Sequence, residues 1–156
     1  MKNLEKKIIS IQEYQKKNIR NKKIVFTNGC FDILHLGHIK LLNEAKKLGE
    51  ILIIGLNSDE SIKKLKGKKR PIMNQKTRSY ILSSMCFVDF IILFNEKTPL
   101  SLIKKLNPDI LVKGNEYKKK EIVGYDFMKQ NNKKIHLISM EKNYSSSNII
   151  KYINTI

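Results

Sequence analysis

The 156-residue sequence predicts a single α/β domain, in which a five-stranded parallel sheet carries helices on both faces. Two observations predict this class. Five short runs rich in β-branched and aromatic residues alternate with segments of helical periodicity. After Glu50, the predicted strand over residues 50–56 is continuously apolar, which is typical of a parallel strand that is covered on both faces. No internal repeat or linker indicates a second domain of comparable size.

The chain begins with an amphipathic pattern. Leu4, Ile8 and Ile11 recur at helical spacing among lysines, which predicts one amphipathic helix ahead of the core. We therefore divide the chain into an N-terminal amphipathic helix, residues 1–20, and a main domain, residues 21–156.

The first half of the main domain contains two predicted strands. The first, residues 23–27, leads through a glycine turn into a helix that ends near Gly49, a residue type favoured just past a helix C-terminus. After the second strand, residues 50–56, the run of residues 57–60, Asn-Ser-Asp-Glu, offers caps for a short helix through Leu65. Six of the eight residues 63–70 are basic, and we expect this segment to form an exposed mobile loop.

The second half repeats the alternation. Asn74 can cap a helix that contains Arg78. The remaining predicted elements are a strand over 89–94, a helix that begins at Thr98 and Pro99, a strand over 109–113, a helix within 119–131, a strand over 134–139, and a last helix capped by Ser145, Ser146 and Ser147.

The turn between the first strand and the first main-domain helix is the strongest functional candidate. In open parallel sheets the ligand lies beyond the carboxyl ends of the strands, and this turn holds Gly29, His35, Gly37 and His38. A strand that leads through glycines into a helix start presents backbone N–H groups at the positive end of a helix dipole. The sequence therefore predicts a phosphate-binding turn.

Composition limits the classes of partner. The formal charge is +17, but only three of the 31 basic residues are arginine, the residue that most often reads guanine or clamps phosphate. We therefore expect no specific nucleic-acid partner, and regard most lysines as solvated. The sequence lacks both a membrane-spanning apolar run and a signal peptide, so we expect a cytoplasmic protein without a membrane partner and with reduced cysteines.

Residues 29–38 read G-x-F-D-x-x-H-x-G-H, and this motif resembles that of the cytidylyltransferase-like nucleotidyltransferases, whose H-x-G-H binds a triphosphate. The resemblance implies a Rossmann-like domain. Further segments look like the adenylyltransferase domain of bacterial ADP-heptose synthases, which transfers AMP from ATP to D-glycero-β-D-manno-heptose 1-phosphate and releases ADP-heptose and pyrophosphate. These segments are Leu56–Asp59, Lys66–Gly67 with Arg70–Pro71, Val112–Gly114, and Ser145–Ile150.

The chemistry fits these residue types. A sugar phosphate is already anionic near neutral pH, since its second pKa is about 6, so no general base is required. The site must instead gather and stabilise negative charge. The catalytic candidates are His35 and His38 on the triphosphate, and Lys66 and Arg78 on the departing pyrophosphate. The alternative for the two histidines is a surface position or a metal-binding pair, and the alternative for Lys66, which we favour less, is that it belongs to a solvated run of charge.

Other candidates bind rather than react. The predicted nucleotide-binding residues are Cys30, Phe31, His35, His38, Gly114, Asn115, Glu116, Ser145, Ser146 and Ser147. Lys64 and Lys113 are expected to bind the sugar phosphate, and Asp32 either meets that phosphate or orients the turn. The expected cofactor is Mg²⁺ carried with ATP, with no separate protein metal site. The expected partners are ATP and a phosphorylated sugar, with a homodimer as one option for the assembly.

Two departures from the related motifs bear on the substrate. Cytidylyltransferases of this group carry an arginine before the last helix, where this chain has Met140, which disfavours CTP. Asn115 and Glu116 alter two positions of the V-K-G-G-D-Y segment of the heptose enzymes. The alternatives are therefore a glycerol-3-phosphate cytidylyltransferase or another small nucleotidyltransferase, and a nonenzymatic polyanion-binding protein.

Overall fold

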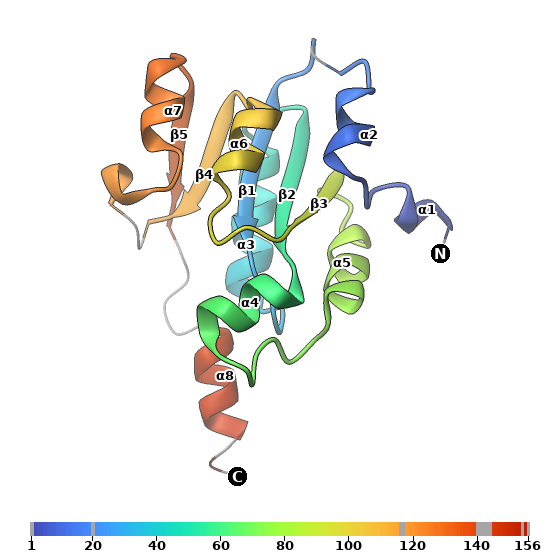
Figure 1. Ribbon diagram of the computed structural model, residues 1–156, viewed down its shortest axis with the longest axis vertical. Helices are drawn as coiled ribbons and strands as arrows, with labels where there is room; N and C mark the ends of the chain where they lie inside the picture. Colours follow the sequence, from blue (N-terminus) through green and yellow to red (C-terminus); the bar gives the residue numbers. More distant parts are fainter. Residues whose placement is uncertain (1, 20, 116–117, 140–144, 154, 156) are drawn as a thin grey trace.

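The computed structural model describes residues 2–19, 21–115, 118–139, 145–153 and 155. Its centre is a five-stranded, entirely parallel sheet with the strand order β3-β2-β1-β4-β5 (Figure 1). The predicted sheet is confirmed. The strands are β1 Ile24–Gly29, β2 Ile51–Asn57, β3 Phe90–Phe94, β4 Ile110–Gly114 and β5 Lys134–Ile138.

Some of the helices begin at a short polar side chain that accepts a hydrogen bond from a free backbone N–H group. Ser58 accepts a hydrogen bond from the N–H of Ser61, and Asn74 accepts one from the N–H of Thr77, as their residue types predicted. The helices are α1 Lys2–Glu5, α2 Ile11–Gln15, α3 Leu36–Lys46, α4 Asp59–Lys66, α5 Gln75–Ser83, α6 Leu100–Leu106, the 3₁₀ helix η1 Lys119–Glu121, α7 Tyr125–Gln130 and α8 Ser146–Ile153.

Helices cover both faces of the sheet because successive strand side chains point to opposite sides. Val25 belongs to the core beneath α3 and α5, together with Leu42 and Leu82. The next residue, Phe26, belongs to the core beneath α6 and α7, together with Ile103. Figure 1 shows α6 in front of the sheet and α3 behind it. None of the helices in the described ranges is long and apolar enough to cross a membrane.

The single N-terminal helix predicted over this part of the chain is wrong. Between α1 and α2 the chain makes a turn at residues 6–7, and Ile8 then forms a parallel bridge with Ile91 of β3. The N–H of Ile91 donates to the carbonyl of Lys7 at 2.8 Å, and the N–H of Ile9 donates to the carbonyl of Ile91 at 3.0 Å. The segment therefore covers the edge of β3, where pairing with a strand outweighs helical spacing. Ser10 then opens α2 with a complete capping box.

Two local predictions need correction. The helix before Gly49, α3, ends at Lys46 with Lys47 as a right-handed C-cap, and the φ angle of Gly49 is not positive, so Gly49 is not a left-handed helix terminator. A Cβ at Gly49 would lie 2.7 Å from the carbonyl oxygen of Lys23, which shows that close backbone approach requires glycine there. The basic segment is also not all loop, because α4 extends through Lys66.

Candidate active site

A pocket of about 390 Å³ opens at the carboxyl edge of β1, β2 and β4, where the parallel topology predicts a ligand site. Its floor is the end of β1, and its walls come from the following turn, α3, the end of β2, the end of α4 and β4. The lining residues are Thr27, Asn28, Gly29, Cys30, Phe31, His38, Leu41, Asn57, Leu65, Lys66, Lys113 and Gly114. Six predicted site residues, Cys30, Phe31, His38, Lys66, Lys113 and Gly114, are thus brought together.

The turn after β1 has an unusual backbone. Phe31 and Ile33 both adopt positive φ angles, 47° and 50°, in the left-handed region that non-glycine residues rarely occupy. Each such residue costs on the order of 1–3 kcal/mol, so the surroundings must hold the turn in place. The Phe31 ring is 3% exposed and fills the space beside Gly29, where a Cβ would lie 3.1 Å from the ring. The absence of a side chain at Gly29 therefore makes room for the Phe31 ring and also leaves the Gly29 backbone accessible to a ligand.

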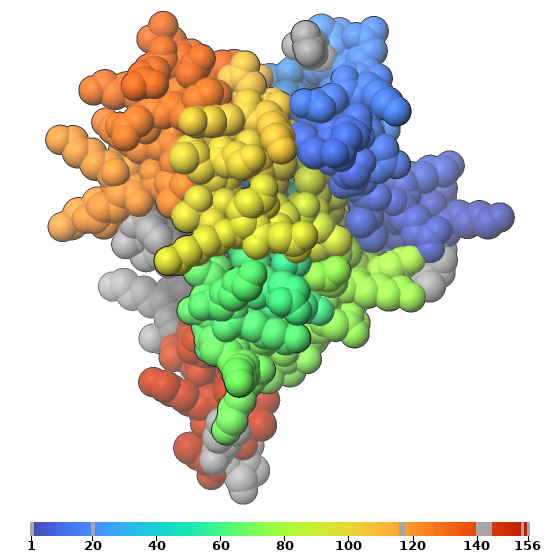
Figure 2. Space-filling view, viewed as in Figure 1, coloured from blue at the N-terminus to red at the C-terminus, as the bar shows by residue number. Residues whose placement is uncertain are grey.

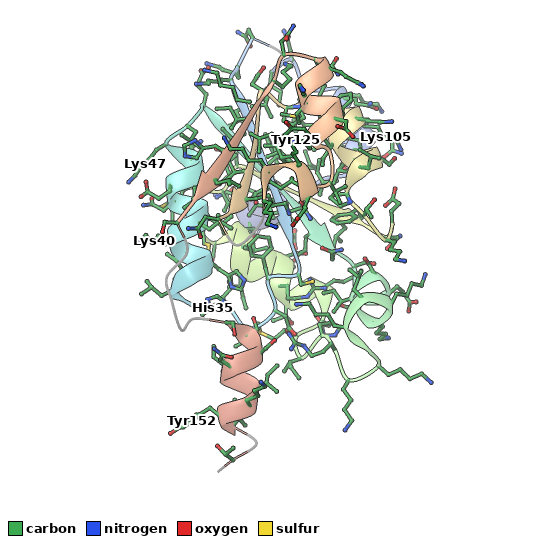
Figure 3. All side chains as sticks on the ribbon, turned by 90° about the vertical axis from the view of Figure 1, so that its left-hand side faces the viewer. His35, Lys40, Lys47, Lys105, Tyr125 and Tyr152 are labelled. Carbon is green, nitrogen blue, oxygen red and sulfur yellow. The ribbon has the colours of Figure 1, made fainter. Side chains whose placement is uncertain are left out.

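His35 and His38 lie together at the start of α3. Their rings stack with centroids 3.8 Å apart, and the His38 ring also contacts that of Phe31 at 5.2 Å. The Nδ1 atoms of both histidines are buried without a hydrogen-bond partner among the described residues. Figure 3 shows His35 near the start of α8, far from Tyr125 and Lys105 at the opposite end of the molecule.

The environment keeps both imidazoles neutral. Burial lowers the pKa of His38 to about 3, and the charges of His35 and Lys66 add to this effect. Burial also lowers the pKa of His35. Near neutral pH the pair therefore carries N–H donors without net charge in the free protein. His38 lines the pocket, whereas His35 lies beside it outside the lining, and the contact of either ring with a triphosphate stays a prediction.

Asp32 is fully engaged by the segment that follows α4. Its carboxylate accepts from Arg70 Nε at 2.8 Å, from the Ile72 N–H at 3.0 Å and from the Met73 N–H at 3.0 Å. Burial on its own raises the pKa of Asp32, but the two N–H groups and the Arg70 guanidinium outweigh it and hold the pKa below its usual value. The side chain is 1% exposed. Of its two predicted roles, the structure supports orientation of the turn over contact with a sugar phosphate.

Arg78 requires a correction. Its side chain has no exposed surface, so direct contact with a departing pyrophosphate does not fit this arrangement. The guanidinium donates to the carbonyls of Cys30 and Asn57 at 2.6 and 2.9 Å, to the carbonyl of Met73 at 2.9 Å, and to Asp59 at 2.7 Å. Arg78 is therefore a positioning residue that fixes the ends of β1 and β2.

The predicted lysines separate by location. Lys66, in the last turn of α4, lines the pocket, whereas Lys64 is exposed and does not. Lys113 reaches the pocket from β4, and its ammonium donates to the Asn28 carbonyl at 3.2 Å. Lys66 and Lys113 thus supply positive charge on two sides of the cavity.

Cys30 contributes its backbone rather than its thiol. Burial raises the pKa of the thiol and outweighs the nearby charges of Lys66 and Arg78. The thiol therefore stays protonated and is a weak nucleophile. Both Cys30 and Phe31 line the pocket, and the role predicted for their backbone N–H groups in binding a nucleotide stays a prediction.

The last predicted cluster joins the end of the chain to the same turn. Ser145 accepts from the N–H of Asn148 at 3.0 Å and caps α8, while Ser146 donates to the carbonyl of Asp32. Ser147 is exposed, and Figure 2 shows α8 (red) projecting from the body of the molecule. The Asn115 N–H donates to the carbonyl of Ile138. Predictions for Glu116 and Met140 lie outside the described residues.

Several residues of the site carry no role predicted from the sequence. Thr27, Asn28 and Asn57 line the pocket, and Arg70 pairs with Asp32 at 2.7 Å. The sequence does contain a signal for Thr27, Asn28 and Asn57, because each is a polar residue at or just after the carboxyl end of a predicted strand. Among the described residues, no group of three or more His, Cys, Asp or Glu side chains is placed to hold a metal ion.

Comparisons with known proteins agree on a family. A family model for cytidylyltransferase-like proteins matches residues 26–152. The bifunctional protein HldE of Helicobacter pylori is 50% identical over 147 residues, which cover 94% of this chain and 31% of that protein. HldE of Campylobacter jejuni is 53% identical over 152 residues, or 96% of this chain and 32% of that protein. The chain thus spans about a third of the length of these curated relatives.

Solved structures show the same fold. A lipopolysaccharide core biosynthesis protein from Thermoplasma volcanium has a TM-score of 0.63 and 29% identity, covering 77% of this chain and 99% of that one. Pantoate–β-alanine ligase from Francisella tularensis, crystallised with a β,γ-ATP ligand and β-alanine, has a TM-score of 0.62 at 18% identity, covering 96% of this chain and 78% of that one. The second likeness concerns the fold alone.

Proposed function

The chain belongs to the cytidylyltransferase-like family of nucleotidyltransferases, and from this premise we propose that it is an adenylyltransferase acting on a sugar 1-phosphate. The proposed acceptor is D-glycero-β-D-manno-heptose 1-phosphate. The motif segments that resemble ADP-heptose synthases support this acceptor, as do the identity to HldE and the likeness to a lipopolysaccharide core biosynthesis protein. The products would be ADP-heptose and pyrophosphate.

The observation that carries this proposal is the donor character of the pocket. Besides the protonated thiol of Cys30, the titratable and charged side chains of its lining are His38, Lys66 and Lys113, while the nearby carboxylate of Asp32 is bound by Arg70 and backbone N–H groups. Such a pocket attracts phosphates, and the described residues of its lining include no free carboxylate that would repel them. It suits a reaction in which every reacting group is anionic.

The reaction requires alignment more than proton transfer. An oxygen of the sugar phosphate attacks the α-phosphorus of ATP and forms a new P–O bond. The bond from the α-phosphorus to the oxygen bridging to the β-phosphorus breaks, and the electron pair leaves with pyrophosphate. Because the attacking oxygen is already anionic, no base has to remove a proton. Donors from His35 and His38, with the ammonium of Lys66, stabilise the charge that develops on the leaving group.

Mg²⁺ is proposed as a partner of the nucleotide rather than of the protein. The described residues offer no carboxylate cage, and Asp32 is already engaged. Mg²⁺ commonly takes its ligands from substrate phosphates and water with few protein groups, so this donor set fits a magnesium–ATP complex held through its phosphates. When bound, the ion neutralises part of the phosphate charge.

The test is a pyrophosphate-release assay with ATP or CTP against a panel of phosphorylated acceptors. We expect ATP to exceed CTP in kcat/KM by at least about tenfold, or about 1.4 kcal/mol, with the heptose 1-phosphate as the best acceptor. A preference for CTP with glycerol 3-phosphate would replace the proposal by the cytidylyltransferase alternative. Absence of release with every acceptor would favour the nonenzymatic reading.

A further inference from the structure

A second pocket, of about 380 Å³, lies at the amino edge of the sheet, at the end of the molecule opposite the candidate active site. Its walls are α2 with the chain that follows it, the first residue of β1, the end of α6, and the turns that lead into β4 and β5. Figure 1 shows α2 and α6 in the upper half of the molecule and α4 and α8 in the lower half. Figure 3 likewise shows Lys105, which lines this pocket, far from His35.

Part of the lining is apolar. Ile24 and Leu106 are each 5% exposed and belong to the core beneath α6 and α7, and Ile19 packs against the same core. The volume of the pocket lies in the range of roughly 300–1,000 Å³ that is typical of sites for small organic molecules. The pocket can therefore enclose the apolar part of a small ligand.

The charged side chains of the lining are mostly basic. They are Lys17, Lys22, Lys105, Lys133 and Asp109. Two of the lysines already have an acidic partner, because Lys133 Nζ lies 2.8 Å from Asp109 Oδ1 and Lys22 Nζ lies 2.9 Å from Glu50 Oε1. The other carboxylate oxygen of Asp109 accepts from the N–H of Ile24 at 2.8 Å. The acidic group of the lining is thus fully engaged.

The two remaining lysines have no such partner. The ammonium of Lys17 lies 5.1 Å from the centre of the Phe90 ring and forms no ion pair within the described ranges. Lys105 has neither an ion pair nor a side-chain hydrogen bond in the described part of the chain. Two uncompensated ammonium groups on one pocket attract a ligand with about two negative charges. A phosphate monoester carries about 1.5 to 2 negative charges near neutral pH.

We propose that the pocket at the amino edge of the sheet is a second ligand site, which binds a small organic phosphate. The apolar part of the ligand packs against Ile19 and Leu106, and its phosphate is held by Lys17 and Lys105. The inference goes beyond the proposed function, because the transfer reaction uses none of these residues. A ligand bound here joins α2 to α6, at a distance from the reacting phosphates.

The first experiment maps binding on the full ¹⁵N-labelled chain by two-dimensional NMR. The probe is phenyl phosphate, with inorganic phosphate for comparison. We expect phenyl phosphate to shift the amide signals of Ile19, Ile24 and Leu106 in a saturable way, and inorganic phosphate to bind there more weakly because it lacks the apolar part. Signals of residues 29–38 report any binding at the candidate active site separately.

The second experiment compares neighbouring lysines of equal charge. Lys17→Ala and Lys105→Ala remove the lysines of the pocket, while Lys16→Ala and Lys104→Ala remove exposed lysines next to them in sequence that are not part of the lining. Lys104 and Lys105 both lie in the last turn of α6, so both offset the helix dipole. We expect each pocket variant to raise the dissociation constant of phenyl phosphate about threefold or more, and each control variant to leave it nearly unchanged.

Several outcomes would overturn the proposal. Shifts confined to residues 29–38 would mean that phosphates bind only at the candidate active site. Equal losses of affinity in all four variants would assign binding to the overall charge of the chain, and equal affinity for inorganic phosphate would remove the apolar part of the site. Melting temperatures of the free variants check folding, and Lys105→Ala decides alone if Lys17→Ala is unfolded, since Lys105 makes no ion pair or hydrogen bond with the described residues.

Discussion

At the scale of single residues, the histidine pair couples the fold to pH. A base whose pKa falls on folding binds fewer protons in the folded state than in the unfolded state. Because the pKa of His38 falls from its ordinary 6.5 to about 3, folding stability is present above pH 6.5 and is lost progressively as the pH falls below it. The lowered pKa of His35 acts in the same direction.

The replacement His38→Asn should therefore flatten the dependence of unfolding free energy on pH between 6.5 and about 4.5. Titration of Asp32 does not overlap this pH range. A carboxyl group with a lowered pKa loses its contribution to the unfolding free energy only when the pH falls below its ordinary pKa of 3.8. The measurement is urea unfolding followed by circular dichroism at several pH values, with exposed His136→Asn as the matched control. Equal slopes for the wild type and His38→Asn would contradict the prediction.

Asp32→Asn tests the link between the turn and the following segment. The change leaves the Arg70 guanidinium, whose side chain is 13% exposed, without its charged partner. Breaking a buried pair in this way costs about 3 kcal/mol of unfolding free energy. Glu60→Gln breaks the exposed Glu60–Lys63 pair and should change stability far less. Urea midpoints decide the question, and an Asp32→Asn variant as stable as Glu60→Gln would show that the link is weak.

The sequence predicts well which site residues lie together when they are close to one another in the chain. His35, His38 and Cys30 lie in one turn because few residues separate them. Arg78 contacts the Cys30 carbonyl across 48 positions of the sequence, and no local pattern encodes that bond. Its positive charge suggested that it contacts the ligand. Its burial, which the sequence does not reveal, instead gives it a role in holding the strand ends.

At the scale of elements, the strands were predicted closely because parallel strands are continuously apolar and end at polar residues. The structure of the N-terminal segment was predicted wrongly, because the adjacent residues Ile8 and Ile9 fit a helix pattern and an edge-strand pairing equally well. The contact with Ile91 that decides between them comes from a distant part of the chain. The capping box at Ser10 was a local signal for the helix start that the spacing of apolar residues obscured.

The end of α4 supports a prediction about the basic segment. Lys66→Ala should lower kcat/KM for ATP about tenfold or more, because a lysine at the pocket wall can contact the triphosphate. Lys69→Ala, an exposed lysine outside the pocket lining, should keep nearly wild-type activity. Pyrophosphate release at limiting ATP measures both. Small and equal losses would instead mean that the segment acts through its overall charge.

At the scale of the whole molecule, the alternation of strands and helices was sufficient to predict a parallel sheet covered on both faces. That alternation does not predict the strand order β3-β2-β1-β4-β5, because the order depends on which hydrophobic faces meet in three dimensions. The pocket follows from that order, since it places the ends of β2 and β4 on either side of β1.

The net charge of +17 leads to a prediction about polyanions. Scattered lysines release counterions from a nucleic acid without reading its bases, so we expect weak binding that falls steeply with salt and does not depend on sequence. Fluorescence anisotropy with two unrelated duplexes at low and physiological salt measures this. Tight binding of one duplex alone at physiological salt would favour a nucleic-acid function.

The left-handed backbone at Ile33 has a consequence for how the chain tolerates change. A β-branched residue is costly in that conformation, whereas glycine and asparagine adopt it easily, so the chain carries a local backbone penalty inside the motif. In a library randomised at this codon and sorted only for survival of heating, glycine and asparagine should become enriched over isoleucine, as deep sequencing of the survivors would reveal. Enrichment of valine and isoleucine instead would mean that the side chain more than compensates for its backbone.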